Sequence, residues 1–129
     1  MQTHPACSLI TDPDRKMFCA MLLVTDSMVQ QTFQTLEDHS YKDNTFVVYT
    51  ADNGGATSAG ASNMPLRGRK GSVFEGGVRA AAWIWGEMVS KEVRGSTFRG
   101  MLHLVDWFPT LMSIATDGKW TPEGTSVYF

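Results

Sequence analysis

Apolar residues recur at helical spacing over the first third of the chain. They lie on one face of a predicted helix and are Phe18, Met21, Leu22, Met28, Val29, Phe33 and Leu36. The triplet Asp12-Pro13-Asp14 is typical of a helix start, because Asp12 can cap, Pro13 suits the first helical position and Asp14 favours the positive end of the dipole. The pattern predicts a helix over residues 13–39 whose apolar face needs a sheet to pack on.

Two short apolar runs predict strands. Residues 45–50 are mostly β-branched or aromatic, and Asp52-Asn53-Gly54-Gly55 follows them directly. Residues 78–85 lie between two glycines and predict the second strand. Between the strands, residues 56–72 have no apolar period and predict a long loop, a kind of segment that is usually functional in a compact domain. Asp106 is expected to cap a further helix that ends near Ala115.

The predicted order is helix, strand, loop, strand, helix, which is an α/β arrangement. We expect helices packed on a few mostly parallel strands. A parallel sheet normally has both faces covered, and two or three strands make only a thin sheet. The sequence therefore predicts a portion of a larger α/β domain.

Composition excludes several classes of protein. The 129 residues are 43% hydrophobic and 19% charged, which is typical of one ordinary globular domain. The net charge of −2 gives no general attraction to nucleic acid. The longest apolar run, residues 17–24, is far shorter than the roughly 20 residues that cross a bilayer. We expect no nucleic-acid partner and no membrane span. The first residues lack the pattern of a signal peptide, so the chain itself is silent on compartment.

The two cysteines, Cys7 and Cys19, are too few for a disulfide framework. Cys19 lies in the apolar part of the first predicted helix. Free cysteines are usually buried. We therefore expect Cys19 to be a buried free thiol.

Asp52 and Asn53 are the first candidate site. A carboxylate and a carboxamide oxygen are ligands of hard divalent cations such as Ca²⁺ or Mg²⁺. Ligands in open α/β sheets bind outside the carboxyl ends of strands, which is where these residues are expected. Two ligands are fewer than such a cation needs. The alternative is a tight hairpin turn at Asn53-Gly54, which the local sequence alone slightly favours.

A basic loop is the second candidate. Arg67, Arg69, Lys70 and Arg79 lie close together, and only Glu75 opposes them. A cationic loop beside a metal-binding carboxylate suits a tetrahedral oxyanion such as sulfate or phosphate. A solvated basic loop and a nucleic-acid patch remain alternatives.

Other polar residues have structural interpretations. Glu75 and Arg79 are four apart and are expected to form an ion pair. His103 lies among apolar residues and is expected to be a satisfied core histidine. His39 is expected at the end of the first helix.

Three spaced motifs carry a family resemblance. They are Val48-Tyr49-Thr50-Ala51-Asp52-Asn53-Gly54-Gly55, then Pro65-Leu66-Arg67-Gly68-Arg69-Lys70, then Phe74-Glu75-Gly76-Gly77-Val78-Arg79. In this order they resemble the type I sulfatase family, closest to its arylsulfatase B-like branch. The resemblance covers roughly residues 13–116. It identifies residues 1–129 as part of a sulfatase catalytic domain.

The resemblance implies an alkaline-phosphatase-like α/β fold and metal-dependent hydrolysis of sulfate esters, of aryl groups or of sugars. It implies that Asp52 and Asn53 are ligands of the catalytic Ca²⁺ and that Lys70 contacts the sulfate. Arg67 and Arg69 are further candidates of the substrate loop. His4, in Thr3-His4-Pro5, matches a family histidine upstream of the metal-binding aspartate. A lysosomal or extracellular location is implied as well.

The chain departs from the family pattern at the nucleophile. The family makes a formylglycine from the cysteine of a Cys-x-Pro-x-Arg motif, and neither Cys7 nor Cys19 lies in one. The N-terminal pair of metal-binding aspartates is absent too. We expect half of the metal site, no nucleophile and no activity from the isolated chain. Two alternatives stay open: a non-catalytic truncated fragment or pseudoenzyme, and a related phosphoester hydrolase of the same superfamily.

Overall fold

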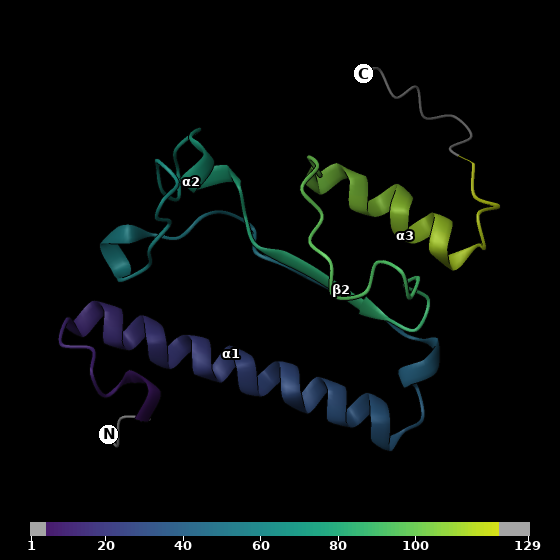
Figure 1. The fold of residues 1–129 in the computed structure, drawn as a ribbon, viewed down its shortest axis with the longest axis horizontal. Helices are drawn as coiled ribbons and strands as arrows, with labels where there is room; N and C mark the ends of the chain where they lie inside the picture. Colours follow the sequence, from purple (N-terminus) through teal and green to yellow (C-terminus); the bar gives the residue numbers. More distant parts are fainter. Residues whose placement is uncertain (1–4, 122–129) are drawn as a thin grey trace. The chain divides into compact units, whose positions relative to one another are not determined.

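The computed structural model describes residues 5–121. Its elements in chain order are η1 (Pro5–Cys7), α1 (Pro13–Asp38), η2 (Lys42–Asn44), β1 (Phe46–Thr50), η3 (Thr57–Ala59), α2 (Glu75–Val78), β2 (Ala82–Gly86), η4 (Leu104–Asp106) and α3 (Trp107–Ala115), where η is a 3-10 helix (Figure 1). The chain divides into two compact units after Arg94, and each is described separately. Among the described residues, no helix is long and apolar enough to span a membrane.

Helix α1 begins and ends where the sequence predicts. The Asp12 carboxylate accepts a hydrogen bond from the Arg15 backbone N–H at 2.7 Å, and Pro13 occupies the first turn. His39 is the C-cap residue, as expected, and Ser40 follows with a positive φ of 58°. The predicted helix over residues 13–39 is confirmed.

A disulfide joins η1 to α1 between Cys7 and Cys19. The prediction of a free thiol at Cys19 is therefore wrong. The segment before α1 turns back along the helix, so that the two Cα atoms lie 6.0 Å apart, a separation that a disulfide spans. Cys7 is 2% exposed, whereas Cys19 is only half-buried. Sequence spacing gave no sign of this return of the chain.

Strands β1 and β2 pair in antiparallel fashion, with Phe46 opposite Gly86 and Thr50 opposite Ala82. The expectation of mostly parallel strands is wrong for this pair. A parallel connection needs a crossover of a dozen or more residues, usually a helix. Residues 51–81 instead form a long loop whose α-helix, α2, has only four residues, and the chain re-enters the sheet at the end where it left.

The second strand is shorter than predicted. Residues 78–85 were expected to form it, but Val78 ends α2 and the strand begins only at Ala82. The Val78 N–H donates to the Phe74 carbonyl at 3.2 Å, and the Arg79 N–H donates to the Glu75 carbonyl at 2.8 Å. These helical hydrogen bonds keep the first residues of the predicted strand out of the sheet.

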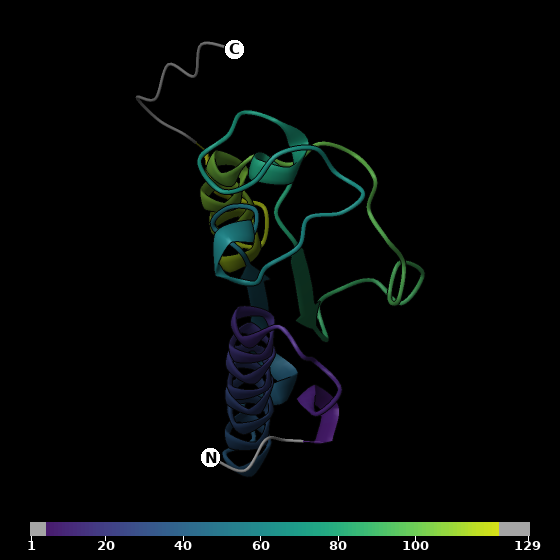
Figure 2. The same cartoon turned by 90° about the vertical axis from the view of Figure 1, so that its left-hand side faces the viewer.

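Aromatic side chains connect α1 to the sheet. The Phe33 ring packs edge-on against Trp85 at a centroid distance of 4.9 Å and lies 6.3 Å from Trp83. Tyr49 stacks on Trp83 at 5.3 Å across the two strands. Helix α1 thus packs on the strand pair through Phe33, as the apolar face of the helix requires. Both views show the helix beside the strands (Figures 1 and 2).

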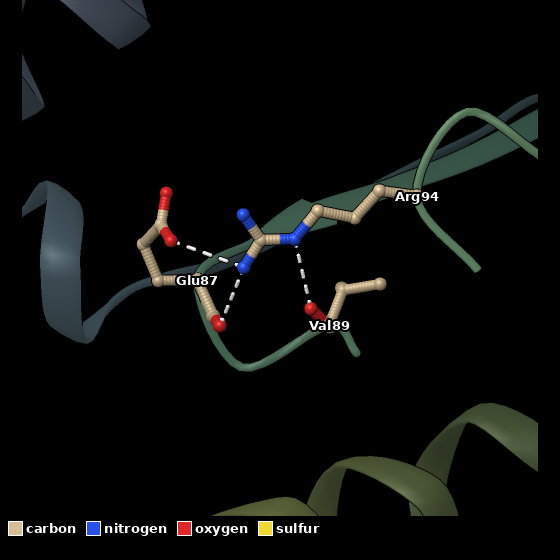
Figure 3. A network of polar contacts seen from close by, with 3 residues as sticks. All are labelled: Glu87, Val89 and Arg94. Carbon is tan, nitrogen blue, oxygen red and sulfur yellow. Dashed lines mark hydrogen bonds and ion pairs between the residues drawn. The ribbon is translucent and has the colours of Figure 1, made fainter. Parts of the chain in front are cut away.

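Arg94 orders the segment that follows β2 (Figure 3). Its Nε donates to the Val89 carbonyl at 2.9 Å. Its Nη2 donates to the Glu87 carbonyl at 2.8 Å and to the Glu87 carboxylate at 3.0 Å. One guanidinium therefore folds residues 87–94 into a compact turn at the end of the first unit.

The second unit contains α3, which confirms the predicted helix. His103 and Asp106 form a capping box ahead of it: the His103 N–H donates to the Asp106 carboxylate at 2.7 Å, and the Val105 N–H donates to His103 Nδ1 at 3.3 Å. His103 is exposed, so the prediction of a core histidine is wrong. Its apolar neighbours Leu104 and Val105 are themselves about two-thirds exposed, at 67% and 66%.

Candidate functional site

The chain leaves the sheet at Asp52 and Asn53. The Ala51 N–H still donates to the Ala81 carbonyl at 2.9 Å, and the pairing with β2 ends there. Asp52 is exposed and Asn53 is half-buried, with its Nδ2 donating to the Gly54 carbonyl at 2.9 Å. Among residues 5–121, no group donates a hydrogen bond to the Asp52 carboxylate or to Asn53 Oδ1. The Asp52 carboxylate and Asn53 Oδ1 are therefore free to bind a ligand.

The tight hairpin turn at Asn53-Gly54 is not formed. Strand β2 does return beside β1, but residues 51–81 separate the two strands. The Gly54 N–H donates to the distant Gly77 carbonyl at 2.8 Å. The turn interpretation, which local sequence favoured, is wrong.

Three segments meet beyond the end of β1, and backbone hydrogen bonds join them. The Gly54 N–H binds the Gly77 carbonyl, the Gly76 N–H binds the Arg67 carbonyl at 2.7 Å, and the Lys70 N–H binds the Gly55 carbonyl at 3.1 Å. The end of β1, the basic loop and α2 thus form one cluster at one end of the strand pair (Figure 1). The three motifs of the sequence converge in space.

Two glycines make this convergence possible. A Cβ atom at Gly54 would overlap the carbonyl oxygen of Gly76. A Cβ atom at Gly76 would lie 2.8 Å from the Arg67 carbonyl oxygen and closer still to that of Gly68. Backbones approach this closely only where no side chain intervenes.

The cations of the basic loop differ in their surroundings. The Arg67 guanidinium lies over the Phe74 ring at 4.0 Å from its centroid, a cation–π contact that fixes the loop to the start of α2. Arg79 pairs with Glu75 at 3.2 Å, which confirms the predicted ion pair. Arg69 and Lys70 are exposed, and their side chains make no hydrogen bond or ion pair with another described residue. These two cations are the ones open to an anion.

Sequence reasoning missed Asn63. Its carboxamide bonds both backbone groups of Gly55 and the Gly68 carbonyl. It is the single asparagine of a loop rich in Ala, Ser and Gly, and only its position between two of the motifs set it apart.

The oxygens at the end of β1 fit a hard cation in part. Asp52 and Asn53 offer carboxylate and carboxamide oxygens, whereas Ca²⁺ takes six to eight oxygen ligands. The described part of the chain contains no cluster of three or more His, Cys, Asp or Glu residues that could hold a metal. His4, the remaining candidate, lies outside the described residues.

A family model for sulfatases matches residues 3–117. This chain belongs to the sulfatase family. It is 35% identical to arylsulfatase J of Mus musculus over 106 residues, which are 82% of this chain and 17% of the relative. It is 33% identical to N-acetylgalactosamine-6-sulfatase of Homo sapiens over 96 residues, which are 70% of this chain and 18% of the relative.

A solved structure supports the same assignment. The crystal structure of Ps i-CgsB in complex with k-i-k-neocarrahexaose superimposes with a TM-score of 0.79 at 30% identity, covering 95% of this chain and 27% of that one. The predicted family and the prediction of a portion of an α/β sulfatase domain are confirmed, although the two strands described here are antiparallel. The chain spans less than a third of these relatives' lengths.

Proposed function

We propose that this chain forms one side of the active site of a metal-dependent hydrolase of sulfate esters. The observation that carries the proposal is the hydrogen bond from the Lys70 N–H to the Gly55 carbonyl. It holds the basic loop next to the end of β1, where the oxygens of Asp52 and Asn53 are open. Membership of the sulfatase family supports sulfate as the anion.

Asp52 and Asn53 are proposed to hold Ca²⁺ through the carboxylate and the carboxamide oxygen. When bound, such an ion polarises the oxygens of the ester. The exposure of Asp52 and the position of both residues at a strand end support this role. The remaining oxygens would come from elsewhere in a complete domain, because these two residues fill only part of a coordination shell.

Lys70 is proposed to contact the sulfate. Its ammonium group would neutralise negative charge on the sulfate ester, including the charge that develops on the ester oxygen as the bond breaks. Arg69 is exposed beside it and is proposed as a second contact. Arg67 is proposed to stabilise the conformation of the loop and not to contact the substrate, since its guanidinium already lies against Phe74. A catalytic role for His4 stays a prediction.

The nucleophile is proposed to come from outside these 129 residues. Cys7 and Cys19 are bonded to each other, so neither is a free thiol that could be converted to formylglycine. We therefore expect hydrolysis from a complete sulfatase domain that contains this segment and none from the isolated chain.

A sulfated sugar is the proposed class of natural substrate. One relative is named for N-acetylgalactosamine-6-sulfate, and the solved structure holds a neocarrahexaose, an oligosaccharide. A lysosomal or extracellular location is proposed with it. The disulfide between Cys7 and Cys19 supports this location, because disulfides persist in oxidising compartments.

The test of the proposed function is Lys70→Ala in a complete sulfatase domain that contains this segment. We expect kcat/KM for a nitrophenyl sulfate to fall more than tenfold, which corresponds to losing more than about 1.4 kcal/mol of transition-state stabilisation. Lys91→Ala is the matched control, because Lys91 is also exposed but lies in the turn after β2.

Equal activities of the two variants would contradict the role of Lys70. A parallel assay with nitrophenyl phosphate distinguishes the related phosphoester hydrolase. If the phosphate ester were hydrolysed faster than the sulfate ester by the unmodified domain, the proposed substrate class would be wrong.

A further inference from the structure

The side chain of Asn63 connects the two halves of the proposed site. Asn63 is half-buried, and its Oδ1 accepts a hydrogen bond from the Gly55 N–H at 2.7 Å. Its Nδ2 donates to the Gly55 carbonyl at 2.9 Å and to the Gly68 carbonyl at 3.2 Å. Both donor hydrogens of the carboxamide and its acceptor oxygen are therefore in use.

The Gly55 carbonyl is the shared point of this network. It accepts from Asn63 Nδ2 and from the Lys70 N–H. A carbonyl oxygen has two lone pairs, and these two donors use both. Gly55 closes the Asp52-Asn53-Gly54-Gly55 motif, and Lys70 closes the basic loop. A single side chain thus forms hydrogen bonds both to the segment of the proposed metal ligands and to the loop of the proposed sulfate contact.

We propose that Asn63 is a positioning residue that holds Lys70 in place relative to Asp52 and Asn53; the inference rests on the proposed function. Left-handed glycines lie within the basic loop at Gly68 and directly after it at Gly71, with φ of 98° and 83°, and the loop has no helix or strand of its own. Without the carboxamide, the loop would lose the only side-chain hydrogen bonds that join it to Gly55 in the described part of the chain. It would keep its backbone bonds, the bond from the Arg69 N–H to Ser72 Oγ and the contact between Arg67 and Phe74. Charge stabilisation depends on donors fixed beforehand, so a loop that moves would bind the anion less tightly.

Asn63→Asp separates the two hydrogen-bonding roles of the carboxamide. The carboxylate keeps an oxygen that can accept from the Gly55 N–H. Its second oxygen would face the Gly55 and Gly68 carbonyl oxygens, where Nδ2 now donates. This repulsion should displace the loop and break the bond from Lys70, while the bond from Gly55 survives.

Amide hydrogen exchange in the 129-residue chain tests this directly. In the unmodified chain the Gly55 and Lys70 amides should both be protected. Asn63→Ala should accelerate exchange of both by at least tenfold. Asn63→Asp should accelerate exchange of the Lys70 amide by at least tenfold and leave the Gly55 amide protected. The Ala51 amide, which bonds to Ala81 in the sheet, should be unaffected in both variants.

Titration with inorganic sulfate, followed at the backbone amide resonance of residue 70, measures the consequence for anion binding. Asn63→Asp should weaken binding at least fivefold more than Ser62→Asp. Ser62 is the adjacent exposed residue, so this control adds the same charge without touching the carboxamide. Lys70→Ala should abolish the response.

The outcomes separate the two proposals. Rapid exchange of the Lys70 amide in the unmodified chain would overturn the positioning role. So would faster exchange of the Ala51 amide as well as the Lys70 amide in both Asn63 variants, because the effect would then not be confined to the loop. Equal sulfate affinities of the Asn63→Asp and Ser62→Asp chains would overturn it too. If Lys70→Ala left sulfate binding unchanged, the proposed function would be wrong, and the exchange data would still decide whether Asn63 controls the loop.

Discussion

Residues without functional groups shape the candidate site as much as Asp52 or Lys70 does. Gly54 and Gly76 allow three backbones to meet, because any side chain there would overlap a neighbouring carbonyl. The position of Lys70 follows from that meeting, through its N–H and the Gly55 carbonyl. Among single residues, the proposed chemistry therefore depends on Asp52 and Lys70, whereas the packing that brings them together depends on the glycines.

Gly54→Ala should lower the free energy of unfolding by roughly 3 kcal/mol, at the upper end of the range for overpacking, because its methyl group would overlap the Gly76 carbonyl. Gly71→Ala is the matched control. A Cβ atom at Gly71 meets no atom within 4 Å, so only its φ of +83° opposes the change, at a cost of about 1 kcal/mol. Urea unfolding followed by circular dichroism measures both. A larger loss at Gly71 than at Gly54 would contradict this account.

Two of the elements are tied by a covalent bond. The disulfide fixes η1 to α1 across a sequence separation of 12 residues, and Cys7 is the most deeply buried apolar side chain among the described residues. Helix α1 by itself buries no side chain fully. The attachment of η1 therefore depends on the disulfide more than on a surrounding core.

Reduction of the disulfide should lower the free energy of unfolding by about 3 kcal/mol, as expected for a closed loop of this size. The measurement is thermal or urea unfolding with and without a reducing agent. The double variant Cys7→Ser, Cys19→Ser is the control and should be insensitive to the reductant. Identical stability of the oxidised and reduced chains would show that η1 contributes nothing to the folded state.

The apolar face of α1 is only partly covered within the described chain. Phe33 packs on Trp83 and Trp85, whereas Met21 and Met28 on the same helix are 50% and 63% exposed. Large exposed apolar areas of this kind usually mark surfaces that contact other protein. In the relatives, this chain corresponds to less than a third of the length.

Phe33→Ala should therefore lower the free energy of unfolding by about 2 kcal/mol, somewhat less than for a fully buried Phe. Met28→Ala should change it by no more than about 0.5 kcal/mol, as for a surface substitution. Urea unfolding of the two variants compares the covered and uncovered parts of one helix. Equal losses would mean that Met28 is packed in solution.

Local chemistry in the sequence determined the elements whose signals are local. Asp12 and Pro13 start α1, and the apolar run before Asp52 forms β1, because capping and β-propensity act between near neighbours. The motifs also led to Asp52, Asn53 and Lys70, whose roles remain predictions. Tertiary structure alone decided the direction of β2, the disulfide and the hydrogen bonds of Asn63. Each depends on where a long loop or a chain end returns in space, and the residue pattern within a segment does not encode that return.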